Sequence, residues 1–196
     1  MKQNLLRLWL LMLMTAVSFS CSDDDHDTNP ETIKLEDSWK DGWNSQKVLD
    51  IAKGQRPDPS VYLDQKYIDF HLAQFNGGAT YLVTKKALDD YGRDTLGYPD
   101  NTQFVMTKTE MDAMLTKTGK DISKIETELG IPAGSWQGKE MVRISIPDPK
   151  ALNVRLPSGN EMGANNLWLP GGHLPTGYSE AVVNKIPKGK YTETPL

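Results

Sequence analysis

One long loop near the end of the chain gathers most of the side chains that could do chemistry. Residues 157–187 read PSGNEMGANNLWLPGGHLPTGYSEAVVNKIP, a run rich in glycine and proline. Glycine permits left-handed backbone and proline fixes φ, so a loop of this composition has a defined shape. Loops longer than about 12–15 residues are uncommon in compact domains unless they are functional or disordered. Apolar residues such as Trp168 argue against disorder, so we expect an ordered loop that forms a site.

Four side chains could carry acid–base chemistry without a metal: His71, Glu161, Asn165 and Glu180. A histidine titrates near neutral pH, so His71 could act as a general acid or base. Glu180 begins a predicted strand, which would hold its carboxylate in a fixed direction. Structural roles are the alternative, because His71 could be a buried core residue and Glu161 and Asn165 could bond the backbone amides of the loop.

The loop and its flanks also supply candidates for substrate binding. These candidates are Arg155, Trp168, Gly171, Gly172 and His173. Three cations could bind a phosphate or pyrophosphate group; they are Arg143, Arg155 and Lys188. A metal-free RNase or an NAD-using transferase would need this inventory of a base, a carboxylate and a cation around a pocket.

Several other kinds of site are not indicated. The chain has three histidines and one cysteine, with no HExxH, cysteine pair or EF-hand run, so we expect no metal and no cofactor. It also has no GxSxG, Walker A or GxGxxG sequence. The formal net charge of −4 argues against a dedicated nucleic-acid-binding face.

The N-terminus indicates export. Lys2 and Arg7 accompany an apolar run over residues 8–17, which suits a secretory signal and is shorter than the roughly 20 residues that span a bilayer. Residues 18–21 then resemble the lipobox of bacterial lipoproteins, although Phe19 departs from its commonest form. An ordinary signal peptide with an incidental cysteine is the alternative.

The lipobox resemblance implies a signal peptide over residues 1–20 and a lipid on Cys21, which would anchor the chain to a membrane. Residues 21–34 would be an acidic tether. Asp23, Asp24 and Asp25 resemble the surface-export signal of some Gram-negative lipoproteins. We therefore expect a cell-envelope protein, anchored to the outer membrane and exposed at the surface.

Residues 35–196 predict a single α+β domain with a small, mainly antiparallel sheet, two to four helices and the long loop. Strands are expected at residues 79–83, 103–106, 141–146, 153–156 and 178–184. Helices are expected at residues 62–75, 85–91, 108–118 and 122–129, with N-caps at Thr84, Thr107 and Asp121. Trp39 and Trp43 could share a helical face within residues 35–52, either for packing or for stacking on a carbohydrate. We expect no strand after residue 184.

The segment SGNEMGANNLWLPGGHLPTGYSEAVV resembles the end of C-terminal domains on RHS-type and other bacterial polymorphic toxins. FHLAQFNGGA, FVMTKTEMDAML and ISKIETELGIP resemble earlier parts of that domain, in the same order. The resemblance covers about residues 60–187 and implies a toxin-like core and an immunity protein as a possible partner. It implies no catalytic assignment, and Thr176-Gly177 stands where the family often has two glycines.

Two hypotheses follow. A metal-free effector that acts on RNA or a nucleotide predicts that the four acid–base candidates converge in one cleft beside a cation. A non-catalytic surface lipoprotein that binds a glycan or a partner protein predicts that His71 and Glu161 are separated or held in structural hydrogen bonds. It also predicts an exposed groove lined by Trp43, Tyr98 and Trp168.

Overall fold

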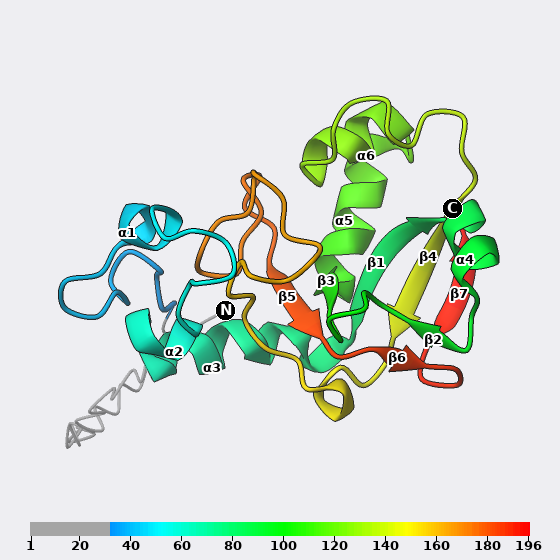
Figure 1. Ribbon diagram of the computed structural model, residues 1–196. Helices are drawn as coiled ribbons and strands as arrows, with labels where there is room; N and C mark the ends of the chain where they lie inside the picture. The colour runs from blue at the N-terminus through cyan, green and yellow to red at the C-terminus, as the bar shows by residue number, and fades with distance from the viewer. Residues whose placement is uncertain (1–31) are drawn as a thin grey trace, which may run out of the picture. The chain divides into compact units, whose positions relative to one another are not determined.

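A five-stranded antiparallel sheet organises residues 32–196, which are the residues that the computed structural model describes. The predicted signal peptide and Cys21 lie outside this range. The strands run in the order β5-β3-β1-β4-β7 (Figure 1). Their bounds are β1 (Ala79–Thr84), β3 (Gln103–Thr107), β4 (Met141–Ile146), β5 (Glu180–Val183) and β7 (Thr192–Pro195). A separate two-stranded ladder pairs β2 (Thr95–Leu96) with β6 (Ile186–Pro187).

The helices lie in two groups along the chain, and together with the sheet they confirm the α+β class. Before the sheet come α1 (Ser45–Leu49), α2 (Pro59–Tyr62), α3 (Gln65–Ala73) and the 3₁₀ turn η1 (Gln74–Gly77). Between the strands come α4 (Lys85–Tyr91), α5 (Lys108–Thr118), α6 (Ile122–Glu128) and the 3₁₀ turn η2 (Lys150–Leu152). Within the described range, no helix is long and apolar enough to cross a membrane.

Three predicted helix starts are confirmed by their caps. Thr84, Thr107 and Asp121 each accept a hydrogen bond from the backbone N–H three residues ahead. Each cap satisfies a donor that the first helical turn leaves without a partner. Gly119 ends α5 in the left-handed conformation, at φ +60°, which glycine adopts without a steric penalty.

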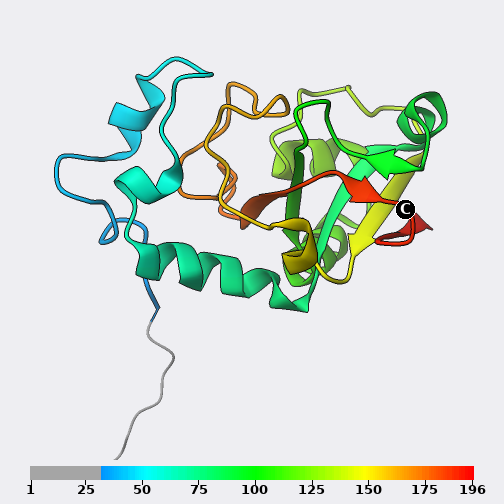
Figure 2. The same cartoon turned by 60° about the horizontal axis from the view of Figure 1, so that its bottom comes forward.

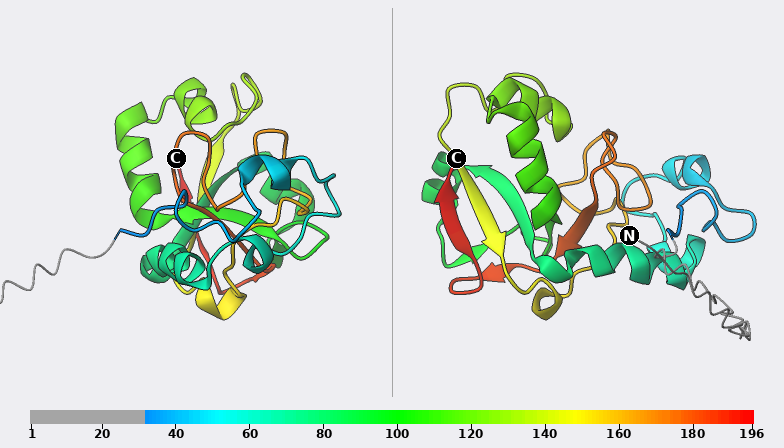
Figure 3. Two further views of the ribbon diagram at one scale, coloured as in Figure 1. Left: turned by 90° about the vertical axis from the view of Figure 1, so that its left-hand side faces the viewer. Right: turned by 180° about the vertical axis from the view of Figure 1, so that it is seen from behind.

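Alternation along the central strand divides the core between the two faces of the sheet. Tyr81 packs into the cluster that contains Phe75 and Leu88, whereas Leu82 packs into the cluster beneath α5 and α6. Met111 and Met114 belong to that second cluster and are core residues, as expected for an apolar helical stripe. Figure 3 shows α5 crossing over one face of the sheet.

The segment before α1 is not the expected helix. Gly42 adopts φ +79° in a turn that separates Trp39 from Trp43, so only α1 forms within residues 35–52. The two indole rings nevertheless meet on Tyr62, with ring centroids 5.9 and 5.8 Å from the tyrosine ring. Both rings are partly buried and pack against the buried cluster that contains Tyr62 and Leu63, which favours the packing role.

Two expectations near the end of the chain are wrong. Residues 153–156 do not form a strand: Arg155 makes an isolated bridge to Val182, because Asn153 turns into the left-handed region after η2 and Pro157 has no N–H to extend a ladder. Two strands, β6 and β7, also form after residue 184. β7 pairs with β4 in register from Thr192 opposite Ser145 to Pro195 opposite Val142, where Pro195 lies on an edge strand that tolerates proline.

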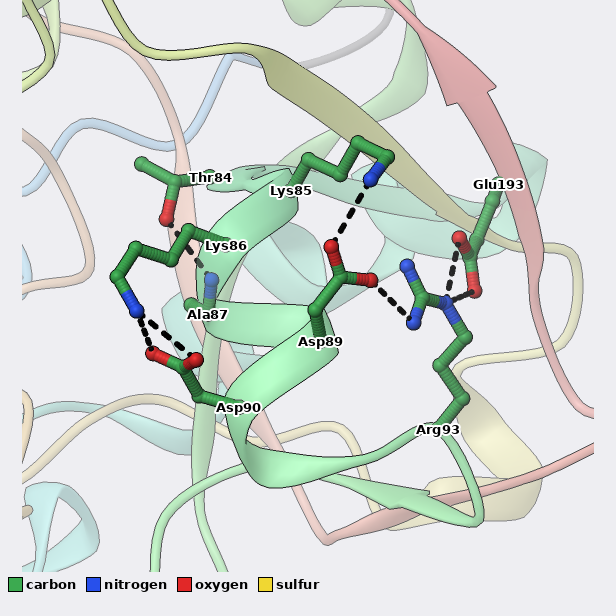
Figure 4. Close-up of polar contacts among 8 residues, drawn as sticks. All are labelled: Thr84, Lys85, Lys86, Ala87, Asp89, Asp90, Arg93 and Glu193. Carbon is green, nitrogen blue, oxygen red and sulfur yellow. Dashed lines mark hydrogen bonds and ion pairs between the residues drawn. The ribbon is translucent and has the colours of Figure 1, made fainter.

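Ion pairs connect α4 to this last strand (Figure 4). Arg93 bonds Asp89 on α4 at 2.8 Å and Glu193 on β7 at 3.0 Å, and Lys85 pairs with Asp89 at 2.9 Å. Such partly exposed pairs each contribute roughly 0–1 kcal/mol to stability. β7 therefore depends mainly on its ladder with β4 for its position.

Candidate functional site

A pocket of about 200 Å³ lies where the Gly/Pro-rich loop meets the sheet and the segment after α6. The loop, residues 157–179, lies between the α1–α3 region and the sheet (Figures 1 and 2). The aromatic walls are formed by Tyr81, Tyr98, Phe104, Trp136 and Trp168. The polar side chains that line it are Gln103, Asn165, His173 and Glu180. No lysine or arginine of the described chain lines this pocket, so its ionisable side chains are one carboxyl, one imidazole and two phenols.

Glu180 is the acidic side chain of the pocket lining, and its carboxyl has no partner among the described residues; the buried Nε1 of Trp168 also has none. Glu180 opens β5, and its backbone N–H donates to the Gly172 carbonyl at 2.6 Å. Its carboxyl is half-buried and has no hydrogen bond or ion pair to any residue of the described range. Burial, with a smaller contribution from the negative charge of Glu161, raises the pKa of Glu180 to about 8. A carboxyl with this pKa exchanges its proton near neutral pH.

His173 faces the same pocket but is held by the protein. The Tyr67 hydroxyl donates to the Gly171 carbonyl at 2.6 Å, which uses its one proton. The contact of 3.0 Å between Tyr67 Oη and His173 Nε2 therefore has the imidazole as donor. Burial lowers the pKa of His173, while the charge of Glu110 and a backbone hydrogen bond to Gly177 act in the opposite direction, so the ring is largely neutral at pH 7.

His71 lies behind the pocket rather than in it. Its side chain is fully buried, and Nε2 is 3.0 Å from the Glu180 backbone carbonyl, to which it can only donate. Burial lowers its pKa to about 4, so the ring is neutral at pH 7. Its ring centroid is 4.9 Å from that of His173. The predicted catalytic histidine thus supports the backbone of Glu180 and the ring of His173, and it is not among the lining residues.

The two other acid–base candidates are held by the loop, as the structural alternative anticipated. Glu161 is buried and accepts hydrogen bonds from the backbone N–H groups of Ser158 and Gly159, each at 2.8 Å. Asn165 lines the pocket, and its side-chain carbonyl accepts from the Leu167 N–H at 2.8 Å. Of the four candidates, Asn165 and Glu180 meet in the pocket, and Glu161 acts on Glu180 through its charge.

The three candidate cations lie elsewhere. Arg155 bonds the side chain of Asn184 at 2.9 Å, and Arg143 pairs with Asp112 on α5. Lys188 is exposed. The expected cation beside the acid–base group is therefore not found in the pocket, and the predicted substrate-binding role of Arg155 has no support from its position.

The remaining predicted binding residues shape the pocket. Trp168 lines it and is buried, with the guanidinium of Arg56 stacked 4.7 Å from the ring centroid. Gly171 supplies the carbonyl that Tyr67 bonds. Gly172 adopts φ +79° directly against His71 and the Glu180 carbonyl. Of the proposed aromatic groove, Trp168 and Tyr98 line the pocket, while Trp43 packs on Tyr62.

Sequence reasoning missed Tyr67, Gln103 and Trp136. Tyr67 precedes His71 by four residues on α3, so helical periodicity places the two rings on one face, and that signal was present. Gln103 and Trp136 carry no such local signal, because they reach the pocket only through the fold. Within residues 32–196, no group of three histidine, cysteine, aspartate or glutamate side chains is placed to hold a metal ion.

Replacing Glu161 by glutamine separates the structural role of this residue from a catalytic one. The amide has one acceptor oxygen in place of two, so a buried N–H of Ser158 or Gly159 loses its partner. Such an orphaned donor costs about 1–3 kcal/mol. We expect E161Q to lower the free energy of unfolding by this amount in chemical denaturation. Unchanged stability would show that the loop does not depend on this carboxylate.

Comparison with known proteins gives no match: no protein-family model fits the chain, and no curated protein aligns with it. Function is therefore argued from the pocket.

Proposed function

We propose that this chain is a metal-free effector enzyme that acts on RNA or a nucleotide, with Glu180 as its general acid–base group. The observation that carries the proposal is the Glu180 carboxyl, which lines the pocket without a hydrogen bond or ion pair to any described residue. Perturbed pKa values of groups in a pocket are a mark of functional sites. The resemblance of residues 60–187 to polymorphic-toxin domains favours the effector role.

The neighbouring side chains support this use of Glu180. His71 bonds the Glu180 backbone carbonyl, and the backbone N–H of Glu180 bonds Gly172, so the residue that carries the carboxyl is fixed from both sides. A fixed acid–base group with a pKa near the working pH can pass a proton to or from a substrate heteroatom. Tyr67 fixes the ring of His173 at the adjacent wall. Because no lysine or arginine of the described chain lines the pocket, we expect any phosphate groups of the substrate to lie outside it.

The proposal extends to the predicted N-terminus. A lipid on Cys21 would attach the domain to the outer membrane, facing outward, through the acidic tether. An immunity protein would then be the expected partner in the producing cell. These parts of the proposal rest on sequence resemblance alone.

A second candidate is a non-catalytic surface lipoprotein that binds a glycan or a partner protein. The structural hydrogen bonds of His71 and Glu161 favour it, as do the aromatic walls of the pocket. Under this reading Glu180 would be a recognition group, and its replacement would change binding alone.

Growth of a test bacterium distinguishes the two functions. We expect residues 22–196, produced in the cytoplasm, to arrest growth, and E180Q to relieve the arrest by at least about tenfold in surviving colonies. E140Q makes the same chemical change at an exposed carboxylate outside the pocket and should arrest growth like the parent. Normal growth with soluble, folded parent protein would contradict the effector proposal and favour the binding protein.

A further inference from the structure

The charges and walls of the pocket indicate what kind of chemical group enters it. We propose that the group bound in this pocket is a planar ring carrying a positive charge, which pairs with the Glu180 carboxylate and stacks on the aromatic walls. This inference rests on the proposed function in using the same pocket, and it specifies the part of the substrate that the pocket receives.

The first argument is electrostatic. Glu180 is the only carboxylate among the lining residues, and no lysine or arginine of the described chain accompanies it there. A half-buried carboxyl without a partner carries an unmet desolvation cost, which an opposite charge can offset. An anionic ligand would add repulsion to that cost. The pocket therefore favours a cation and disfavours a phosphate or carboxylate group.

The second argument comes from the walls. Tyr98, Phe104, Trp136 and Trp168 surround the space, and aromatic faces attract cations by about 0.5–2 kcal/mol per contact. Trp168 already carries one cation, since the Arg56 guanidinium lies 4.7 Å from its ring centroid. These walls suit a flat ring, with its charge directed at the carboxyl.

The third argument is size. The pocket volume of about 200 Å³ is below the roughly 300–1,000 Å³ of sites that enclose drug-sized ligands. A single ring fits such a space, whereas a whole nucleotide does not. The remainder of a larger substrate would therefore lie outside the pocket.

Binding of a cation should also change the protonation of Glu180. The titratable groups around it are Glu161 and His173 of the loop, His71 of α3, Glu110 of α5, Tyr81 of β1 and Tyr98. The two histidines are neutral at pH 7 because burial lowers their pKa values. With no cation among these groups, Glu180 is mostly protonated at pH 7 and must release its proton when a cationic ring binds.

Calorimetry with three probes of matched shape tests the inference: benzamidinium, neutral benzamide and anionic benzoate. We expect benzamidinium to bind at least tenfold more tightly than benzamide, and benzoate to bind more weakly than both. The affinity for benzamidinium should rise about tenfold per pH unit from pH 6 to the pKa of Glu180, which is about 8, and then level off. At pH 7, titrations in buffers of different ionisation enthalpy should show close to one proton released per ligand.

The matched variants give the contrast. E180Q should lose the preference for benzamidinium and the proton release, whereas E140Q should keep both. Equal or tighter binding of benzoate, or benzamidinium affinity that does not change with pH, would overturn the inference. The proton release is measured on the unsubstituted protein, so the test holds even if E180Q folds poorly.

The outcome is separate from that of the growth experiment. Selective binding of benzamidinium by a protein that does not arrest growth would keep the ligand class and reject the effector enzyme. Growth arrest that needs Glu180, with no selectivity among the probes, would keep the enzyme and reject the cationic ring.

Discussion

G172A is expected to lower the free energy of unfolding by about 3 kcal/mol or more and to deform the pocket. A Cβ at this position would overlap Leu156 Cδ2, and it would lie 2.8 Å from His71 Nε2 and 3.0 Å from the Glu180 carbonyl oxygen. The backbone is also left-handed, at φ +79°, which costs a non-glycine residue roughly 1–2 kcal/mol. Because the histidine and the carbonyl are the groups that hold Glu180, the strain acts directly on the proposed acid–base residue.

G177A is the matched control for the G172A experiment. Gly177 lies in the same loop at φ +90°, but a Cβ there would meet nothing within 4 Å. Its substitution therefore measures the backbone penalty alone, of roughly 1–2 kcal/mol. Urea denaturation of both variants gives the contribution of the close contact as the difference between them. Equal losses for G172A and G177A would show that the packing against His71 is loose and does not position Glu180.

The sequence predicted those parts of the fold that depend on interactions between residues close together in the chain. The helix caps at Thr84, Thr107 and Asp121 could be predicted because each side chain accepts a hydrogen bond from a backbone N–H only three residues ahead. The strand β4 follows from the two-residue alternation of its side chains between buried and partly exposed positions. The loop was also expected to be ordered, and Glu161 shows why: its carboxylate satisfies two backbone N–H groups of its own turn.

The errors come from contacts between distant parts of the chain. β7 is polar and exposed, so its composition gives no strand pattern, and only the pairing with β4 makes it one. Residues 153–156 looked like a strand, but the left-handed Asn153 and Pro157 limit them to the bridge at Arg155. Gly42 likewise adopts a positive φ, which its lack of a Cβ allows, so a turn forms where the sequence predicts a helix.

The sequence predicts only part of the site, because most contacts in it join distant parts of the chain. Glu180 was a candidate because it begins a strand next to the loop, and that placement is correct. The partners that decide its chemistry come from β1, β3 and the segment after α6, and no spacing in the sequence relates them to it. The residue type alone makes His71 a candidate acid–base group, yet its burial makes it a supporting group. Burial is a property of the assembled fold and is invisible in the residue type.

E180Q is expected to stabilise the protein at alkaline pH while removing its proposed function. In the folded protein the pKa of Glu180 is about 8, raised from an ordinary value of 4.5. Between these two values the folded state keeps a proton that the unfolded state has released, so wild-type stability falls as pH rises from 4.5 to 8 and is then level. Glutamine never ionises and does not undergo this loss. Because water partly screens the half-buried carboxyl, we expect a gain of about 2 kcal/mol for E180Q at pH 9.

The pH dependence of the difference is what identifies the cause. Unfolding free energies of E180Q and the unsubstituted protein should nearly agree at pH 5 and separate progressively toward pH 8. His71 and His173 also titrate with lowered pKa values, but they are present in both proteins and cancel in the difference. E140Q should show no such separation, since its carboxylate is exposed. A difference that stays constant from pH 5 to pH 9 would mean that Glu180 is ionised in the folded state at neutral pH. Suppose that E180Q gains stability only at the pH values where Glu180 of the unsubstituted protein is ionised, and that E180Q no longer arrests growth. The protein would then be less stable because it keeps an unpaired carboxyl at the place where a substrate can provide the partner.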